Sequence, residues 1–522
     1  MPSFMSPGTH GGARWSRRQL LGHLPALSSL AALGLLSACG GGATVAQSAS
    51  ATLGSAAATQ TSTVAAGSTT AAGSSTVTAT AATTLTTSAP AAATTTESSA
   101  ISTSASTAAT AVRKGATAIQ YWTWDQIALQ TENKSFLPQF RQQHPDIEVQ
   151  ATYVAWNTNG YFDKLQTMGA SADAPDVFWQ SVAYTWDFAN NGLALDLQPL
   201  INRSLKLEDY FQPVLSILRF PNPSSGDMYA FPSRWVASLL YYNKDLLQKV
   251  GVAPPDETWD YQKMIDAATK LTVHGADPTS SHFGMSARVD NSILDSWIKA
   301  YGGQVLNDDF SKCMLDQPNA TSTVQLVADQ CVKNAIAPKP GEKLGTVAPT
   351  FQDGTIAMTI DGSYTIDTYR QKAKFDWDVT LVPKGPVSRS VYGGPDSVAI
   401  SKGSRNPDAA WTFVQAYCGP GRPVESYAGG SVPVYKPTAQ QPAWLEQGKA
   451  PAHKQVLLDS AQYLQGADFS SHWSEWRAAL SAELNPALTG QKTAQDACRS
   501  ATDRINAILA QVKINKQVHP NL

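Results

Sequence analysis

The chain has 522 residues, more than a single hydrophobic core usually organises. Hydrophobic residues make up 43% of it and charged residues 15%, so at least part of the chain is globular. The 39 Lys and Arg nearly balance the 41 Asp and Glu, giving a formal net charge of -2. This balance gives no electrostatic reason to expect nucleic acid or an acidic lipid surface as the main partner.

Residues 1–39 have the order of an export signal. Three arginines precede an uncharged apolar run, LPALSSLAALGLLSA. This run is shorter than the roughly 20 apolar residues that a membrane-spanning helix needs. It ends in LSAC, which resembles the bacterial lipobox, whose cysteine is lipidated and becomes the mature N-terminus. We therefore expect Cys39 to carry a lipid; the alternative is an ordinary secretory peptide with a chance cysteine. The stretch SRRQLL also resembles a twin-arginine signal, so the export route stays open.

Residues 40–115 consist mostly of Ala, Ser, Thr and Gly. No charged side chain occurs between Cys39 and Glu97, and bulky apolar residues are sparse. Such a segment cannot bury enough surface to offset the entropy of ordering it. We expect a disordered stalk that holds the folded part away from the membrane.

From about Ala116 the chain alternates short apolar strands with amphipathic helices, which predicts an α/β domain with a largely parallel sheet. The expected strands are AIQYWTW (118–124), IEVQATYV (147–154) and PDVFW (175–179). The expected helices lie in NKSFLPQFRQQHPD (133–146), where Phe136 and Phe140 share one face and the helix stops at His144-Pro145, in YFDKLQTMGAS (161–171) and in TWDFANNGLALDL (185–197).

The middle of the chain predicts a strand followed at once by a new compact unit. WVASLLYY (235–242) is strand-like, and NKDLLQKV makes one or two helical turns. Gly251 suits the left-handed residue after a helix, and the two prolines that follow forbid continuation. Thr258 suits the N-cap of the next helix, with Asp260 in its first turn.

Four cysteines remain in the globular part, an even number in an exported chain, so disulfides are expected. Of the three pairings that they allow, Cys313 with Cys331 closes the shortest loop and is the first expectation. The pairing of Cys418 and Cys498 stays open. None of the four has the close spacing of a zinc or redox motif, and we expect no metal and no cofactor.

Several stretches resemble bacterial extracellular solute-binding proteins, in the sugar-binding group that includes the maltose- and glycerol-phosphate-binding proteins. LLYYNKDLLQKVGVAPPDETWD is similar to their crossover segment, and four further stretches match in the expected order from about Ala116 to the C-terminus. These are FQDGTIAMTIDGSYTID (351–367), the segment WDVTLVPKGP with VYGGPDSVAISKGSRNPDAAWTFV (377–414), GSVPVYK (430–436) and TAQDACRSATDRINAIL (493–509).

The resemblance implies an α/β, two-lobed periplasmic-binding-protein-like fold of class II, with discontinuous lobes and a hinge. Lobe one would hold 116–233 and 384–428, and lobe two 234–383 and 429–522. A chain that crosses between lobes more than once makes a hinge, and a hinge permits closure around a ligand.

The function that this implies is a lipid-anchored extracytoplasmic receptor of an ABC importer, and not an enzyme. Its expected partners are a sugar or related polar solute, the permease subunits, and the membrane through the lipid; we expect a monomer and no nucleic acid.

Sugar rings offer apolar C–H faces that aromatic side chains cover, and hydroxyls that carboxylates, amides and guanidinium groups meet. The chain has 14 Trp and 17 Tyr, most of which we expect in the core. Position at strand ends, in loops and at the crossing, together with the resemblance, selects candidates. The candidate ligand-binding residues are Trp124, Asp125, Trp156, Trp179, Trp235, Asp361, Tyr364, Gly394, Asp396 and Trp476.

Some alternatives stay open. Tyr364 stands where the family has a tryptophan. Asp361 is either a ligand acceptor or a cap for the residues that follow it, and Arg234 is either a cleft donor or part of a hinge ion pair. Of Trp473 and Trp476, we expect one at the cleft and one in the core, and favour Trp476 for the cleft.

Two other functions are alternatives. A secreted carbohydrate-active hydrolase needs two carboxylates about 5–10 Å apart, which 41 acidic residues do not exclude, but no HExxH, GxSxG, P-loop or GxGxxG pattern occurs. A surface adhesin would suit the stalk, yet the globular part has no repeats.

Overall fold

The computed structural model describes residues 113–156, 160–169, 173–222, 225–277, 280–289, 293–427, 429–465 and 468–521. Cys39, the export signal and nearly all of the expected stalk lie outside the described residues, so their roles stay predictions. Among the residues that are described, no helix is both long and apolar enough to cross a membrane.

The first part of the fold is a parallel sheet, as the alternation of strands and helices predicts. Strand β1 (Thr117–Thr123) lies between β2 (Ile147–Tyr153) and β3 (Val177–Ser181) and runs parallel to both. The helices of this part are α1 (Gln126–Lys134), α2 (Phe136–Gln143), α3 (Tyr161–Gly169) and α4 (Thr185–Asn190). The helix expected from the spacing of Phe136 and Phe140 is α2, which ends next to His144-Pro145 as predicted but begins at Phe136, because Asn133 and Lys134 belong to the preceding helix α1.

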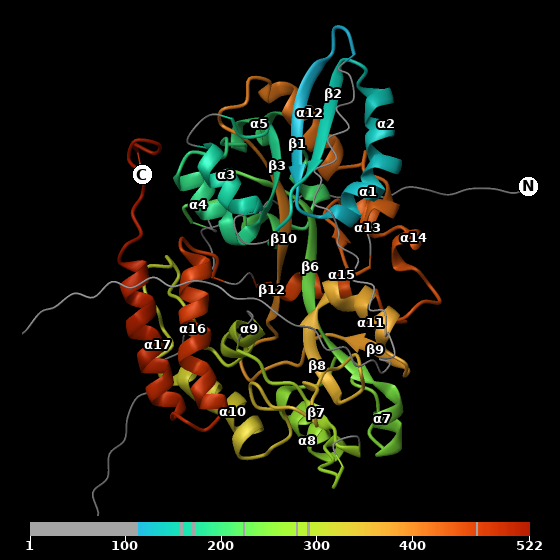
Figure 1. Cartoon of the computed structure of the whole chain (residues 1–522), viewed down its shortest axis with the longest axis vertical. Coiled ribbons are helices and arrows are strands. Elements are labelled where there is room, and N and C mark those ends of the chain that lie inside the picture. The colour runs from blue at the N-terminus through green and yellow to red at the C-terminus, as the bar shows by residue number, and fades with distance from the viewer. Residues whose placement is uncertain are drawn as a thin grey trace, which may run out of the picture. The chain divides into compact units, whose positions relative to one another are not determined.

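Two long antiparallel strands, β6 (Phe231–Asn243) and β10 (Val391–Ile400), continue this sheet (Figure 1). The first half of β6 pairs with β10, and its second half pairs with β8 (Ile356–Gly362). The strand order in the described sheet is β2-β1-β3-β10-β6-β8-β7. The strand expected over 235–242 is therefore longer, because it serves two parts of one sheet.

The second part gathers helices around the other end of β6. Strand β7 (Phe283–Met285) runs parallel to β8. Asp260, not Thr258, caps α8: its carboxylate accepts a hydrogen bond from the Lys263 backbone N–H at 2.8 Å. Gly251 has φ 68°, the left-handed conformation that its place after α7 (Lys244–Lys249) predicts. The long helices here are α8 (Tyr261–Leu271), α9 (Ile293–Ala300), α10 (Pro318–Val332), α16 (Trp473–Leu488) and α17 (Ala494–Leu509).

Shorter elements complete the fold. They are the strands β4 (Arg219–Phe220), β5 (Asp227–Met228), β9 (Trp377–Thr380), β11 (Val432–Pro433) and β12 (Leu464–Gln465), and the helices α5 (Gln198–Ser204), α6 (Gln212–Ser216), α11 (Ile366–Lys372), α12 (Pro407–Cys418), α13 (Lys436–Ala439), α14 (Pro442–Leu445) and α15 (Val456–Ser460).

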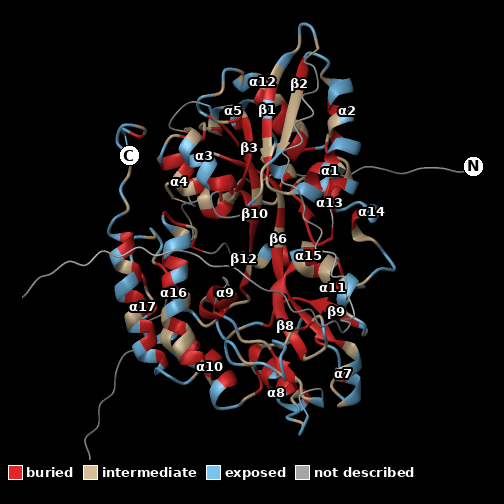
Figure 2. Cartoon of the chain, in the orientation of Figure 1, coloured by how far each residue is buried: buried red, intermediate tan, exposed pale blue. Residues whose placement is uncertain are grey.

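The strands and the inward helix faces form the core (Figure 2). The core also holds a buried ion pair: Arg422 Nη2 lies 2.8 Å from Glu132 Oε1, and both side chains are fully buried. The Arg422 guanidinium lies between the rings of Tyr417 and Tyr427, 4.1 and 4.6 Å from their centroids. This pair joins α1 to the segment after α12, which lies about 290 positions further along the chain.

The expected disulfide between Cys313 and Cys331 is wrong. All four described cysteines are free and buried. The thiol of Cys313 lies 3.7 Å from Thr502 Oγ1, whereas that of Cys331 lies 3.4 Å from the Pro338 carbonyl oxygen. The two thiols therefore have different neighbours. A short separation in sequence does not show which side chains the fold places together.

Candidate functional site

The β6–β10 ribbon has one face that solvent reaches and one that is buried. Arg234 lies opposite Asp396, and Val236 lies opposite Gly394. Because side chains alternate along a strand, these four residues share one face of the ribbon. Arg234, Val236 and Asp396 are half-buried on it, whereas Trp235 on the other face is fully buried. The accessible face is the first component of the candidate site.

Arg234 is held by two carboxylates and an aromatic ring. Its Nη1 lies 3.2 Å from Asp125 Oδ2 and its Nε lies 2.9 Å from Asp396 Oδ2. Its guanidinium carbon lies 4.5 Å from the centroid of Trp179. Burial alone lowers the pKa of Arg234, but the charges of Asp396 and Asp125 outweigh burial and raise it. The structure therefore contains an ion pair at Arg234, with Asp125 and Asp396 as its partners.

The aromatic cluster beside Arg234 is centred on Trp124. Its ring centroid lies 5.1 Å from that of Trp179, 5.3 Å from that of Trp156 and 5.2 Å from that of Tyr161. Trp156 is 52% exposed, whereas Trp179 is fully buried. The cluster therefore has an outer ring that solvent reaches and an inner ring that belongs to the core.

Strand ends explain why these residues meet. Trp124 and Asp125 directly follow β1, and the Asp125 carboxylate caps α1 by accepting from the Ala128 N–H at 2.9 Å. The hydroxyl oxygen of Tyr161 lies 2.9 Å from the carbonyl oxygen of Trp122 and 2.8 Å from that of Trp179, so its single hydrogen is shared between them. These bonds tie the carboxyl ends of β1 and β3 together, which is where open α/β sheets bind ligands.

A second cluster lies at the end of β8. Asp361 Oδ2 accepts a 2.8 Å hydrogen bond from the hydroxyl of Tyr369, and Asp361 Oδ1 accepts from the Gly362 N–H at 2.8 Å. Arg288 Nη1 lies 4.0 Å from Asp361 Oδ2, and the Tyr364 hydroxyl lies 3.5 Å from Oδ1. Gly362 is the N-cap residue of the single turn η4 (Ser363–Thr365), so Asp361 also bonds the backbone at the start of this turn.

Tyr392 connects the two clusters. It precedes Gly394 and Asp396 by two and four positions on β10 and so shares their face. The pKa of Tyr364 is raised, first by burial of part of the side chain and then by the nearby Asp361 and Tyr392. Tyr364 is nevertheless 55% exposed, so its ring remains open to a ligand.

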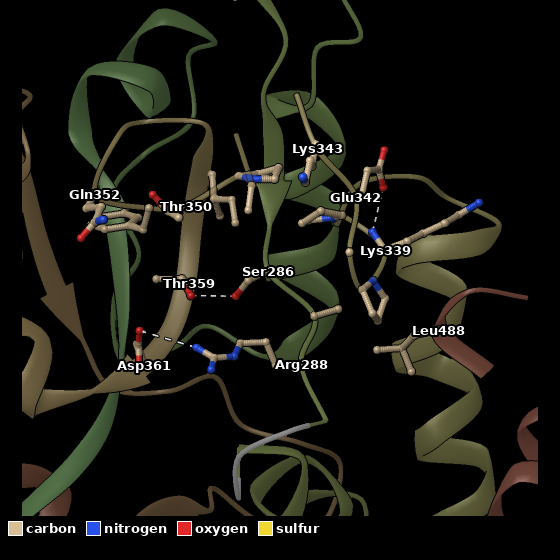
Figure 3. A pocket seen from close by; sticks show the side chains of 18 of the residues that line it. Ser286, Arg288, Lys339, Glu342, Lys343, Thr350, Gln352, Thr359, Asp361 and Leu488 are labelled. Carbon is tan, nitrogen blue, oxygen red and sulfur yellow. Dashed lines mark hydrogen bonds and ion pairs between the residues drawn. The ribbon is translucent and has the colours of Figure 1, made fainter. Parts of the chain in front are cut away.

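A cavity of about 640 Å³ opens beside the second cluster (Figure 3). Asp361 and Arg288 face each other at one end of it, and Ser286 and Thr359 meet along its side. It is also lined by the segments 338–343 and 348–352, by α11, and by the C-terminal half of α16.

Two predicted site residues lie elsewhere. Trp235 packs its ring 5.2 Å from that of Phe211 on the buried face of the ribbon. Trp476 is fully buried and donates from Nε1 to Ser470 Oγ at 3.0 Å, whereas Trp473 is half-buried. The preference for Trp476 over Trp473 at the cleft is therefore corrected: Trp476 is the core residue.

Sequence reasoning missed Arg288, Tyr392 and Val236. Two signals could have found the first two. Arg288 follows the carboxyl end of a short strand, the same rule that selected Trp124, and Tyr392 has the two-residue spacing from Gly394 that places it on the same face. Among the described residues, no group of three or more His, Cys, Asp and Glu is arranged to hold a metal ion.

A model of the family described as bacterial extracellular solute-binding protein matches residues 124–421, more than half of the chain. The chain belongs to this family. Its relatives and structural neighbours are binding proteins and not enzymes, and this protein is likewise a binding protein.

Two curated relatives illustrate the range of the family. The sn-glycerol-3-phosphate-binding periplasmic protein UgpB of Pectobacterium atrosepticum is 24% identical over 424 residues, covering 75% of this chain and 91% of its own. The maltotriose-binding protein of Pyrococcus abyssi is 22% identical over 289 residues, covering 54% of this chain and 58% of its own.

Solved structures show the same two-lobed α/β fold. The sugar-binding protein MalE of Xanthomonas citri has a TM-score of 0.66 at 18% identity, with 78% of this chain and 100% of that one covered. An ABC substrate-binding protein of Listeria monocytogenes in complex with cycloalternan has a TM-score of 0.63 at 24% identity, covering 76% and 99%. The expected fold class is thereby confirmed.

Proposed function

We propose that this solute-binding protein is the lipid-anchored, extracytoplasmic receptor of an ABC importer, which captures a neutral sugar and delivers it to the permease. Cys39 would carry the lipid, and residues 40–115 would form the stalk. The observation that carries the proposal is the accessible ribbon face with Arg234 and Asp396, next to an aromatic cluster whose outer ring, Trp156, is exposed to solvent. A flat ring and charged hydrogen-bonding groups beside each other are what a sugar needs.

The lobes are proposed to be 116–233 with 384–428, and 234–383 with 429–522. The pairing of β6 supports this division, since its two halves belong to two parts of the sheet. Closure around the solute would bend the ribbon near Val236 and Gly394, and it requires a solute that binds the closed state better than the open one.

The charges favour a neutral sugar over a phosphorylated solute. The guanidinium of Arg234 already faces two carboxylates, Asp125 and Asp396, so this group of three carries a net charge of -1. The positive charge of Arg288 is balanced by the nearby carboxylate of Asp361. A phosphate group at the ribbon would meet like charges, which disfavour its binding, whereas sugar hydroxyls can donate to the same carboxylates.

The test is isothermal titration calorimetry with neutral mono- and oligosaccharides and with sn-glycerol-3-phosphate. We expect one neutral sugar to bind stoichiometrically without being hydrolysed, and to reduce the radius of gyration in small-angle scattering. Tight binding of sn-glycerol-3-phosphate with no sugar binding would overturn the solute class, and release of hydrolysed sugar would favour the hydrolase.

The matched variants are Trp156→Ala and Val273→Ala, which both truncate exposed apolar side chains. Loss of the Trp156 ring should weaken sugar binding by about tenfold, or about 1.4 kcal/mol. Val273→Ala should leave binding unchanged. Trp179→Ala is the poorer test, because removal of a fully buried Trp costs about 3–5 kcal/mol of stability by itself.

A further inference from the structure

Residues 513–519, which we call the strap, connect the second part of the fold to the first. Helix α17, which precedes them, packs on α10 and α16. The strap itself lies against α4 and the β4–β5 pair. Figure 1 shows the chain passing from the end of α17 toward the side on which α4 lies. The strap is therefore a contact between the two parts that lies outside the β6–β10 ribbon.

Three hydrogen bonds hold the strap on the end of α4. The side chain of Asn190 makes two of them: its Nδ2 donates to the Lys513 carbonyl oxygen at 3.0 Å, and its Oδ1 accepts from the Asn515 N–H at 2.9 Å. The third joins His519 Nε2 to the Ala189 carbonyl oxygen at 2.9 Å. A carbonyl oxygen can only accept, so Nε2 carries the hydrogen in this bond.

The end of the strap also fits closely against the first part. The imidazole of His519 is buried, and its ring centroid lies 4.9 Å from that of Phe220 and 5.8 Å from that of Tyr229. Val518 lies directly over Gly192, where a Cβ atom would be only 3.0 Å from a Val518 methyl carbon. This fit shows that the strap docks at a specific place on the first part.

Two cavities flank the strap. A cavity of about 630 Å³ lies on one side, lined by Asp187 from the first part and by His472 and Lys513 from the second. A cavity of about 410 Å³ lies beside Phe220 and Tyr229. A contact that is small, partly polar and hollow at its edges can separate without exposing a large apolar surface.

The chain between α17 and the strap has little slack. Helix α17 ends at Leu509, and the first of the three bonds to α4 is made by Lys513. Four residues span at most about 14 Å when they are fully extended. A movement of α17 relative to α4 that exceeds this reach must break the bonds of the strap.

The strap is docked in a conformation whose proposed solute site is open. The ring of Trp156 is 52% exposed, and solvent reaches Arg234 on the ribbon. Closure around a solute would cover these side chains, and it would move the part that contains α17 relative to the part that contains α4. The docked strap therefore favours the open arrangement over the closed one.

We propose that the strap is a conformational restraint that stabilises the open state, and that solute capture releases it from α4. The inference rests on the proposed function and adds a regulating element to it. A solute shifts the equilibrium only by its preference for the closed state, and part of that preference is used to release the strap. Affinity should therefore depend on contacts that the solute never touches.

The decisive variant fastens the strap with a disulfide. A Cβ atom at Gly192 would lie 3.8 Å from the Cβ of Val518, within the range of about 3.5–4.5 Å found in disulfides. Gly192→Cys combined with Val518→Cys, in a Cys39→Ala background, gives an oxidised form with the strap fixed and a reduced form with it free. Gly192 has φ 72°, which strains a cysteine in both forms, so the reduced form is the matched control.

A second pair of variants loosens the strap. Asn190→Ala removes two of the three bonds, whereas Asn191→Ala truncates the same side chain at an exposed neighbouring position. Circular dichroism and the melting temperature verify folding of each variant. Without solute, small-angle scattering should give a smaller radius of gyration for Asn190→Ala than for Asn191→Ala, because closed molecules become more frequent.

Calorimetry and scattering with maltotriose as the probe test the coupling to solute. The reduced double variant should bind maltotriose and contract. The oxidised form should bind it at least tenfold more weakly and should not contract, and reductant should restore both properties. Asn190→Ala should bind maltotriose about threefold more tightly than Asn191→Ala does.

The outcomes separate the two proposals. If the oxidised form binds maltotriose and contracts as the reduced form does, the restraint is refuted and the sugar receptor stands. If neither maltotriose nor any other neutral sugar binds, the proposed function fails, and scattering without solute still decides the restraint. Equal radii of gyration for Asn190→Ala and Asn191→Ala would then refute it, and a smaller radius for Asn190→Ala would support it.

Discussion

Arg234 lies over the face of Trp179, with its guanidinium carbon 4.5 Å from the ring centroid. The strand β6 carries the cation and β3 carries the ring, and β10 lies between them in the sheet. The contact therefore joins the crossing ribbon to the first parallel sheet. It fixes the orientation of the guanidinium toward Asp125 and Asp396, and with it the charge that a solute meets.

Replacing Arg234 by Lys should damage this arrangement although the charge is kept. A lysine has no planar group to stack on Trp179 and cannot donate to two carboxylates in the same fixed geometry. We expect the free energy of unfolding in urea to fall by about 1–2 kcal/mol, and solute affinity to fall with it. Arg203→Lys is the control, since Arg203 and its partner Asp408 are 59% and 91% exposed. Equal small effects in both variants would contradict the prediction.

Removing one partner of the buried Glu132–Arg422 pair should cost far more stability than replacing Arg234 by Lys. Glu132→Ala leaves a guanidinium buried without its carboxylate, which typically costs about 3–5 kcal/mol. Asp408→Ala, which breaks an exposed pair, should cost less than about 1 kcal/mol. Guanidinium unfolding monitored by tryptophan fluorescence compares them, and a loss under about 1 kcal/mol for Glu132→Ala would show that the core relaxes around the charge.

Glu446 should contribute stability that acid removes. Burial alone raises its pKa, but hydrogen bonds from Lys454 and Lys449 and the charge of Arg370 outweigh burial and lower it to about 2, from 4.5. The unfolded state binds more protons in this window, so the contribution is complete above pH 4.5 and is lost as the pH falls toward 2.

The measurement is the urea midpoint from pH 6 to pH 2.5. Relative to the unchanged protein, Glu446→Gln should be less stable at pH 6 by an amount on the order of 1 kcal/mol, after allowance for solvent screening, and the difference should shrink on acidification. A difference that stays constant over this range would contradict the assignment.

The contribution of Asp187 to stability should change with pH in the opposite direction to that of Glu446. Burial raises its pKa above 3.8, and the hydrogen bond from Ser471 and the charge of His472 only partly compensate. The folded state then binds more protons, so ionisation of Asp187 costs stability as the pH rises through its folded pKa. Asp187→Asn should therefore be more stable than the unchanged protein at pH 7 and lose that advantage below pH 3.8. The exposed Asp459→Asn should show neither effect in the same urea titrations.

The described cysteines should be unreactive in the folded protein. Burial raises the pKa of Cys313 to about 11 and that of Cys331 to about 12, so few thiolates are present at neutral pH. In a Cys39→Ala background, Ellman's reagent should react with four thiols only after denaturation, and the melting temperature should not depend on reductant. A reductant-dependent melting temperature would restore the disulfide interpretation.

Part of the site followed from strand ends. Trp124, Asp125 and Trp179 come together because the carboxyl ends of parallel strands meet at one edge of a sheet, and the sequence marks those ends by its alternating apolar pattern. Trp235 shows the limit of this reasoning. It is one position from Arg234, and a single step along a strand turns the side chain from the accessible face to the core.

The sequence is a poorer guide to which helix residues are buried and to which distant segments come into contact. Trp473 and Trp476 lie three residues apart at the start of α16, yet Trp476 is fully buried and donates to Ser470, whereas Trp473 is half-buried and packs against the edge of the core. The cavity beside Asp361 is lined by α11, α16 and the 338–352 segment, and no local sequence pattern predicts that these segments meet.

The sequence alone determined the alternation of strands and helices and the sites of turns such as Gly251. It also determined the family membership, which several stretches in a fixed order make recognisable. These depend on neighbours within a few residues, where backbone preference and side-chain periodicity act directly. The tertiary structure alone decided which face of the ribbon solvent reaches, that Arg234 pairs with Asp125 and Asp396, and that the four described cysteines are free and buried. Those outcomes depend on how segments hundreds of residues apart exclude water from one another, and that competition is settled only when the whole core packs.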